Sequence, residues 1–254
     1  MPRIKAGVSI KTPDEIKIMQ EGGIKLSGVK EKIRKEVKIG MRASDIEDIA
    51  QSEIKKAGGK ASFAMVPGYS WATCVNVNEG VVHGIPHKSV KFKKGDLVSV
   101  DVGMFFKGYH TDTSFSIGLD VDKKLNDFMK AGQKSLDNAI GKAQIGNKIY
   151  DLSEAMQGTL KSAGLSPVRS LVGHGIGRNL HEEPQIPCFI LGERKDSVDI
   201  VEGMVLAIEV MYTKGNPRVI TQEDGWTIAI ASGRISALYE ETVAVTSSGP
   251  LVLT

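Results

Sequence analysis

The sequence Leu97-Val98-Ser99-Val100-Asp101-Val102-Gly103-Met104 is an apolar run with a carboxylate at its centre. Its length and its valines are typical of a buried strand. A second stretch, Tyr109-His110-Thr111-Asp112-Thr113-Ser114-Phe115, follows after Lys107-Gly108, which has the composition of a hairpin turn. The sequence therefore predicts antiparallel strands over 96–106 and 109–117.

The hairpin predicts where the two aspartates point. When the loop contains an even number of residues, paired positions add up to an odd number, and positions 101 and 112 meet that condition. Both carboxylates then lie on the same face, opposite or diagonal, with Cβ atoms roughly 5–8 Å apart. Carboxylates that close repel each other unless one takes up a proton or a cation lies between them.

Further elements lie on both sides of this hairpin. Two helices are expected in the first sixty residues, starting at Thr12-Pro13-Asp14-Glu15 and Ser44-Asp45-Ile46-Glu47, and the second stops at Gly58-Gly59. The first presents an apolar stripe of Ile16, Met19, Ile24, Leu26 and Val29. Two more helices are expected near 122–143 and 148–163, and the other strands are expected around 72–77, 166–172, 204–212, 225–231 and 236–246.

This order of helix, helix, strands occurs twice, which favours an α+β fold with antiparallel pairing. The tripeptide His-Gly-Ile also occurs twice, at His83 and His174. We therefore expect two related halves around one sheet, in a single domain that spans residues 1–254, with residues 1–11 as an N-terminal tail.

The composition limits the function classes. The chain has 254 residues, a net charge of +3 and 41% hydrophobic residues, which excludes a disordered, collagen-like or coiled-coil protein. The charge is too small to indicate nucleic-acid binding, and the sequence has no apolar run long enough to span a membrane and no signal-like start, so we expect a cytoplasmic protein. The basic first sixty residues fit either a solvated lysine-rich surface or contact with a polyanion such as the ribosome.

Acids recur in the later apolar strands. Glu209 lies in Val205-Leu206-Ala207-Ile208-Glu209-Val210-Met211, and Glu240 and Glu241 lie in Ala237-Leu238-Tyr239-Glu240-Glu241-Thr242-Val243. Side chains alternate along a strand, so only one of the last two can share the face of Asp101 and Asp112, and periodicity leaves open which one. Buried ionised carboxylates need partners, which are either separate unseen cationic side chains or bound metal. Four acids together favour two divalent cations, with His174 as a candidate nitrogen ligand.

Several motifs in order resemble the methionine aminopeptidase family, type 1. They are Asn-Glu-Gly-Val-Val-His-Gly-Ile-Pro at 78–86, Val-Asp-Val-Gly at 100–103, Thr-Asp-Thr-Ser at 111–114, Gly-His-Gly-Ile-Gly at 173–177, His-Glu-Glu-Pro at 181–184, Ile-Glu-Val at 208–210 and Tyr-Glu-Glu-Thr at 239–242. The resemblance implies a pita-bread fold, which consists of two pseudo-symmetric halves with a central antiparallel sheet and helices outside. It also implies removal of an N-terminal methionine by metal-activated water.

The resemblance assigns roles to particular residues. The metal ligands would be Asp101, Asp112, His174, Glu209 and Glu240, holding two divalent ions (Co, Mn, Fe or Zn). Glu209 would also transfer protons, His181 would stabilise the oxyanion and His83 would lie near the scissile nitrogen.

The family pocket for the methionine side chain corresponds to Tyr69, Cys74 and Trp226, with Phe63 nearby. Leu180 and Val66 stand where the family often has aromatic residues, which puts the shape of the pocket in question. The expected partners are nascent polypeptide N-termini with a small second residue, and the expected state is a monomer with no specific nucleic acid and no membrane. From the resemblance we expect a type 1 enzyme, without the insertion of type 2 enzymes and without an N-terminal zinc-finger extension.

Two alternatives remain at this point. A prolidase-like Xaa-Pro peptidase has the same metal core but usually carries an extra N-terminal domain. A metal-free binding protein of the same fold would have lost the ligands, whereas this sequence has all five.

Overall fold

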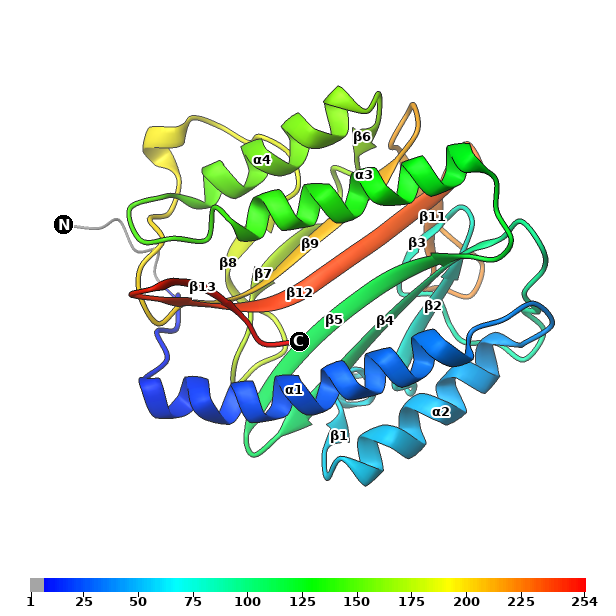
Figure 1. The fold of residues 1–254 in the computed structure, drawn as a ribbon, viewed down its shortest axis with the longest axis horizontal. Helices are drawn as coiled ribbons and strands as arrows, with labels where there is room; N and C mark the ends of the chain where they lie inside the picture. The colour runs from blue at the N-terminus through cyan, green and yellow to red at the C-terminus, as the bar shows by residue number, and fades with distance from the viewer. Residues whose placement is uncertain (1–6) are drawn as a thin grey trace.

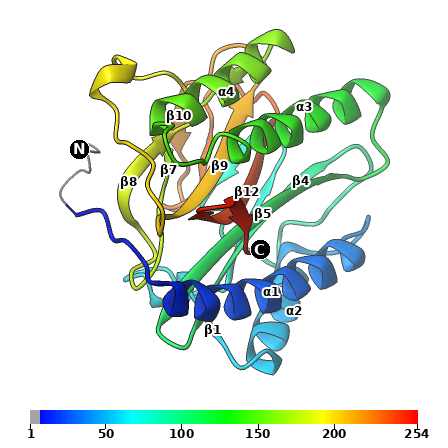
Figure 2. The same cartoon turned by 60° about the vertical axis from the view of Figure 1, so that its left-hand side comes forward.

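The computed structural model describes residues 7–254, which form a curved sheet with four helices on one of its faces (Figures 1 and 2). The main sheet has the strand order β1-β4-β5-β12-β9-β7-β8, with β2 on β4, β13 on β12 and β6 on β9. A smaller sheet has the order β10-β11-β3. The pairs are antiparallel, as predicted for an α+β fold.

The bounds of the elements are as follows. The helices are α1 (Pro13–Glu36), α2 (Ala43–Lys56), α3 (Lys123–Ile140) and α4 (Ile149–Ser162), with short 3₁₀ turns at Phe63–Met65 and Arg194–Asp196. The strands are β1 (Lys60–Ala61), β2 (Thr73–Val77), β3 (Gly80–Val82), β4 (Leu97–Phe106), β5 (Tyr109–Gly118), β6 (Ser166–Pro167), β7 (Val172–Gly175), β8 (Glu182–Pro187), β9 (Val205–Thr213), β10 (Val219–Thr221), β11 (Ile228–Ile230), β12 (Ser236–Thr246) and β13 (Gly249–Val252).

Helix α1 begins as its sequence predicts. The Thr12 side chain accepts a hydrogen bond from the Glu15 N–H at 3.3 Å, and the Glu15 carboxylate accepts one from the Thr12 N–H at 2.8 Å, which completes a capping box. Met19, Leu26 and Val29 are buried, but the predicted stripe was wrong at one position. Ile24 is 63% exposed, because its position on the helix directs its side chain away from the sheet.

The predicted start of α2 was also wrong. The helix begins at Ala43, and the Asp45 carboxylate accepts a hydrogen bond from the Arg42 N–H at 2.8 Å. Ser44 is therefore already inside the helix. Glu47, which the capping pattern assigned to the helix start, is buried and turned toward the sheet.

The β4–β5 hairpin has the predicted two-residue turn. Phe106 pairs with Tyr109, and Lys107 and Gly108 both have positive φ, which matches the right-handed twist of the strands. Gly103 lies opposite Asp112, and Asp101 lies opposite Ser114. The two aspartates are thus diagonal neighbours on one face, as the hairpin arithmetic predicts.

Two predicted strands differ from the structure. The stretch 166–172 is interrupted, because β6 ends at Pro167 and β7 begins at Val172. Only Ile228–Ile230 of the stretch 225–231 is a strand, since Asp224 closes a tight turn by accepting hydrogen bonds from the N–H groups of Trp226 and Thr227. Proline and the turn residues end the regular pairing at these places.

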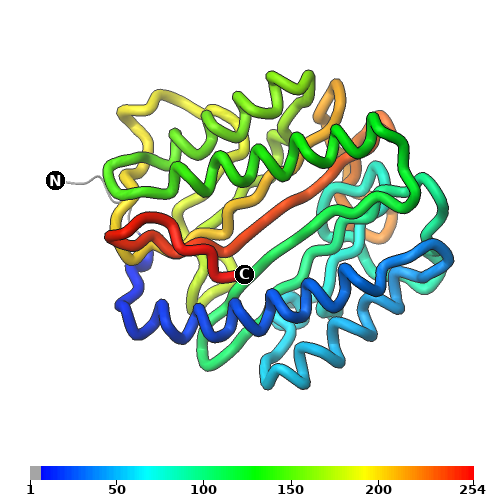
Figure 3. The backbone as a smooth tube through the Cα atoms, viewed as in Figure 1, coloured from blue at the N-terminus to red at the C-terminus, as the bar shows by residue number. Residues whose placement is uncertain are grey.

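The fold consists of two similar halves, each with a helix pair over part of the sheet (Figure 3). Helices α1 and α2 pack on β4, β5 and β2, and α3 packs on β9 and β12 with α4 beside it. Strands β5 and β12 join the halves, and β13 lies between the two helix pairs (Figure 1). This arrangement is the predicted pita-bread fold.

The N-terminal stretch is described only in part. Residues 1–6 of the predicted tail lie outside the described residues. From residue 7 on, Val8 forms a bridge with Glu183, and Lys11 is buried. None of the helices formed by residues 7–254 combines the length and the apolar character that crossing a bilayer requires.

Candidate metal centre

Strand register gathers the acidic side chains on the face of the sheet away from the helices. Cys74 lies opposite Asp101, Asp101 opposite Ser114, Ser114 opposite Glu240, and Glu240 opposite Glu209. Directly opposed residues in antiparallel strands share a face, so this row crosses β2, β4, β5, β12 and β9 on one side. Asp112, two residues before Ser114, points to the same side.

His174 joins this group from the next strand. Residue Ala207 of β9 pairs with His174 of β7, and the His174 Nδ1 lies 2.8 Å from the carbonyl oxygen of Gly175. A carbonyl can only accept, so Nδ1 carries the proton and Nε2 keeps a free lone pair. Burial lowers the pKa of His174 to about 4, which keeps the ring neutral at pH 7. Ligand atoms of Asp112, His174 and Glu240 lie within 4.8 Å of one another.

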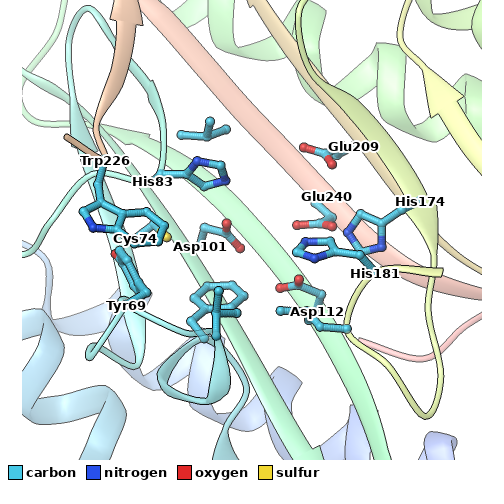
Figure 4. A pocket seen from close by; sticks show the side chains of 14 residues that line it. Tyr69, Cys74, His83, Asp101, Asp112, His174, His181, Glu209, Trp226 and Glu240 are labelled. Atoms are coloured by element: carbon cyan, nitrogen blue, oxygen red, sulfur yellow. The ribbon is translucent and has the colours of Figure 1, made fainter. Parts of the chain in front are cut away.

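These groups open onto one cavity of about 160 Å³. In Figure 4, Tyr69, Cys74 and Trp226 lie on one side of Asp101, and His174, Glu209 and Glu240 lie on the other. The cavity thus has an aromatic end and an acidic end. Its lining residues are Phe63, Val66, Tyr69, Cys74, Val82, His83, Asp101, Asp112, His174, Leu180, His181, Glu209, Trp226 and Glu240.

The clustered carboxyl groups resist ionisation. Burial raises the pKa of Asp112 to about 7 and that of Glu209 to about 8, where the charge of Asp112 adds to the effect. Burial and then the neighbouring carboxylates also raise the pKa of Asp101 and Glu240 well above their ordinary values. The protein alone therefore does not favour full deprotonation of this cluster at neutral pH.

No cationic side chain in the described range 7–254 neutralises the cluster. Among residues 7–254, no lysine or arginine forms an ion pair with Asp101, Asp112, Glu209 or Glu240. The buried Asp101 Oδ1 has no hydrogen-bond partner in the described part of the chain. Oxygen-rich groups with one imidazole and an unpartnered carboxylate oxygen fit divalent transition-metal ions.

The adjacent Glu241 has a different environment. It points to the helix side, where Lys30 Nζ lies 2.7 Å from its Oε1 and Thr254 Oγ1 lies 2.7 Å from its Oε2. Helix α1 thus supplies a cation for Glu241, whereas Glu240 faces the cavity. This contact answers the question that strand periodicity left open.

The buried ion pair of Lys30 and Glu241 leads to a prediction about the stability of the fold. Lys30→Met should destabilise the fold by about 3 kcal/mol, because it leaves the Glu241 charge buried without its partner. Thermal unfolding measures this, with Lys32→Met as the matched control, since the Lys32–Glu36 pair on the same helix is exposed and should matter little. Equal unfolding temperatures for the two variants would show that the pair does not stabilise the fold.

The two remaining candidate histidines lie at the rim of the cavity. The ring of His181 is 4.5 Å from that of His174, at 75°. His83 begins the first His-Gly-Ile motif, has a φ of 57° and lines the cavity on the side of Cys74 and Trp226, across from His181 (Figure 4). Burial lowers the pKa of both rings, so each favours the neutral form.

The aromatic end is built around Tyr69. Its ring makes edge contacts with Trp226 at 5.1 Å and with Trp71 at 5.2 Å between centroids, and its hydroxyl donates to the carbonyl oxygen of Thr73 at 2.9 Å. Burial raises the pKa of Cys74 well above its ordinary value, so its sulfur stays an apolar thiol. Leu180 and Val66, the two departures from the family pattern, both line this cavity.

One supporting residue was missed by the sequence analysis. The buried Glu47 carboxylate of α2 accepts hydrogen bonds from the N–H groups of Ala72 at 2.7 Å and Thr73 at 3.0 Å and from the Thr73 hydroxyl at 2.7 Å. It therefore holds the segment between Tyr69 and Cys74. Helical burial periodicity was the available signal, because Glu47 lies four residues after the buried Ala43 and three before the buried Ala50, but the capping pattern concealed it.

Comparisons with known proteins agree with this geometry. The family model for metallopeptidase family M24 matches residues 17–247. A methionine aminopeptidase 1 from Bacillus subtilis is 38% identical over 248 residues, which cover 96% of this chain and 98% of the relative. A crystal structure of methionine aminopeptidase from Thermotoga maritima superposes with a TM-score of 0.94 and 38% identity, covering 97% of this chain and 99% of that one.

More distant structures share the fold. A prolidase from Pyrococcus furiosus has a TM-score of 0.73 at 21% identity and matches 96% of this chain but 65% of its own. That likeness concerns the architecture alone. The match of the family model and the near-complete alignment with the curated relatives decide the assignment. The chain therefore belongs to metallopeptidase family M24 and, within it, to the methionine aminopeptidases.

Proposed function

We propose that this hydrolase removes the N-terminal methionine from nascent proteins and peptides by attack of activated water on the first peptide bond. The observation that carries the proposal is the single cavity in which an uncompensated acidic cluster adjoins an aromatic pocket. An acidic cluster alone fits any metallohydrolase. The adjoining apolar pocket adds a place for one side chain of the substrate.

The proposed metal ligands are Asp101, Asp112, His174, Glu209 and Glu240. Asp112 and Glu240 would bridge two divalent ions, Asp101 would hold one, and His174 with Glu209 the other. Support comes from the shared face of these residues and from the unpartnered Oδ1 of Asp101. Bound divalent ions would lower the pKa of water and so supply hydroxide near neutral pH.

The chain's own groups would guide the protons and the substrate. Glu209, which lines the cavity and lies opposite Glu240 in the strand register, would accept a proton from water and return it to the leaving amine. His181, whose pKa is lowered by burial so that the ring favours its neutral form, would donate a hydrogen bond to the developing oxyanion. His83, on the opposite rim, would lie beside the scissile nitrogen.

The aromatic end would bind the methionine side chain. Tyr69 and Trp226 offer aromatic rings, and Cys74 offers a neutral thiol. A contact between a thioether sulfur and an aromatic ring is stabilising by about 0.3–1.5 kcal/mol. Phe63 and Leu180 line the same cavity. Apolar contacts of this kind favour methionine over charged side chains.

Several wider features belong to the same proposal. The whole chain 1–254 would act as one catalytic domain and as a monomer in the cytoplasm. Its substrates would be nascent chains with a small second residue, with contact to the ribosome as a further expectation and with no specific nucleic acid and no membrane as partners. The metal would be Co, Mn, Fe or Zn.

A paired assay tests the function. We expect the purified protein to contain divalent metal and to release methionine from Met-Ala-Ser, while Ala-Pro is left intact. Cleavage of Ala-Pro alone would move the assignment to a prolidase-like peptidase, and absence of both metal and cleavage would leave a binding protein. Anaerobic reconstitution with each of the four metals in turn would then identify the one that supports turnover.

A further inference from the structure

The segment before α1 reaches the loop that carries His181. This loop connects β7 to β8 and places His181 at the rim of the cavity. Lys11 Nζ lies 2.6 Å from Glu182 Oε2, in the residue next to His181. The exposed fractions of the two side chains are 3% and 7%, so the pair is shielded from water.

Lys11 is held from several sides. Its N–H donates to the carbonyl oxygen of Gly203 at 2.8 Å, and its Nζ also donates to that of Ser9 at 3.2 Å. A side chain at Gly177 would collide with the Lys11 stem, so the loop packs directly on it. Few conformations of the lysine are compatible with these contacts.

Glu182 in turn holds the loop backbone. Its Oε1 accepts a hydrogen bond from the Asn179 N–H at 3.0 Å, two residues before His181. The carboxylate thus connects the loop to the lysine through both oxygens. A charged lysine beside a buried carboxylate strengthens such contacts, since charge-assisted hydrogen bonds are the stronger ones.

The first turn of α1 makes a second contact with the same loop. Arg178 Nη2 lies 3.0 Å from Glu15 Oε1, which also accepts a hydrogen bond from the Tyr109 hydroxyl at 2.6 Å. The Arg178 guanidinium lies over the Tyr109 ring at 4.9 Å. Arg178 is exposed, so this contact is weaker than the buried pair.

We propose that Lys11 is a positioning residue for His181, acting through its buried ion pair with Glu182. The segment 9–15 is then part of the active-site architecture and not a free tail. The inference rests on the proposed function of His181 at the oxyanion. An oxyanion donor must lie within hydrogen-bond distance of the developing charge, so a loop displaced by about 1 Å can cost up to about a hundredfold in rate.

Kinetics of Lys11→Met provide the first test. We expect kcat for Met-Ala-Ser to fall about tenfold to a hundredfold, with KM and metal content unchanged. Lys11→Arg should recover part of kcat because it keeps a cation beside Glu182. Lys17→Met is the matched control and should match the wild type, since Lys17 lies on the exposed face of α1. Unchanged kcat in Lys11→Met would overturn the proposal.

A double-mutant cycle separates positioning from general stability. In the His181→Ala background, Lys11→Met should change kcat by less than about twofold, because the group that it positions is gone. A full additional loss there would mean that Lys11 acts elsewhere. If Lys11→Met alone does not fold, Lys11→Met with Glu182→Met serves instead, because an apolar pair removes the uncompensated charge. Restored kcat in that variant would overturn the proposal.

Hydrogen exchange tests the positioning without activity. Amide exchange of residues 176–183 should accelerate in Lys11→Met relative to Lys17→Met, while β4 and β9 stay protected. Unchanged exchange in the loop would overturn the positioning role even if the wild type releases methionine. A wild type that releases no methionine would instead refute the proposed function, and exchange would still report whether Lys11 holds the loop.

Discussion

Glu240→Gln should abolish turnover, whereas Glu241→Gln, one residue further along β12, should keep turnover and lower the unfolding temperature. Glu240 faces the cavity and lies opposite Glu209, with ligand atoms of Asp112 and His174 within 4.8 Å. An amide cannot bridge two cations as a carboxylate does. We expect kcat to fall at least about a thousandfold, which corresponds to about 4 kcal/mol in the barrier.

The second variant probes the opposite face. The Glu241 carboxylate forms an ion pair with the buried Lys30 ammonium. Glu241→Gln weakens that pair without altering the groups that line the cavity. The unfolding temperature should therefore fall while metal content stays that of the wild type. The two neighbouring substitutions thus separate catalysis from stability.

The measurements are kcat for Met-Ala-Ser, bound metal by elemental analysis, and thermal unfolding of both variants under the same conditions. Equal losses of activity in Glu240→Gln and Glu241→Gln would contradict the assignment of Glu240 to the metal centre. Full activity of Glu240→Gln would contradict it more directly. Loss of metal in Glu241→Gln would show that the helix side also determines metal binding.

The second large effect concerns stability without metal. After chelation, the protein should become less stable as the pH rises from about 7 to 8.5, and added Mn²⁺ or Co²⁺ should restore stability at the upper end. The pKa of Asp112 is raised from 3.8 to about 7 and that of Glu209 from 4.5 to about 8, mainly by burial. Asp101 and Glu240 shift in the same direction.

The direction of this pH effect follows from the number of protons bound by the folded and the unfolded protein. A carboxyl with a raised pKa holds its proton in the folded state but has lost it in the unfolded state at this pH, so the folded state binds more protons. Its protonation supports the fold below the ordinary pKa, and that contribution is lost as the pH rises through the folded-state pKa. Histidines do not obscure the effect, since unfolded histidines are already mostly neutral above about pH 7.

Asp101→Asn identifies the source of this pH dependence. It removes one of the clustered acids, so the chelated variant should lose less stability between pH 7 and 8.5 than the chelated wild type. It should also lose turnover, with little change in fold. A chelated wild type whose unfolding temperature is flat or rises over this range would show that the acids are not held together as the structure indicates.

Local sequence patterns predicted the four helices and the long strands, with less accurate edges, and they missed the shorter strands β1, β3, β8, β10 and β13. The capping box at Thr12 and Glu15 placed the start of α1, because both partners lie within one helical turn. The same pattern at Ser44 failed. The Asp45 carboxylate accepts the hydrogen bond from the Arg42 N–H at the helix start, while the Glu47 carboxylate accepts one from the Thr73 N–H of β2. The break after Pro167 was also missed, because Val168 and Leu171 look strand-like, but a bend at Arg169 and Ser170 separates β6 from β7.

The candidate site was predictable where one hairpin determines it. Asp101 and Asp112 belong to consecutive strands, so turn length and alternation were enough to place both on one face. The contribution of Lys11 had no such signal. Its partner Glu182 is 171 residues away, and only the docking of the N-terminal segment on the β7–β8 loop brings them together.

By itself, the sequence determined the α+β class, the hairpin register and the presence of buried acids that need cations, because these depend on periodicity over a few residues. Strand periodicity left open which of Glu240 and Glu241 faces the cavity, and the family resemblance only implied Glu240; the tertiary structure decided it, since that depends on which strands and helices become neighbours. Lys30 compensates Glu241 from the helix side, and no comparable side chain among the described residues compensates Glu240. Charge balance across the sheet, which no local pattern encodes, is the physical reason for this division.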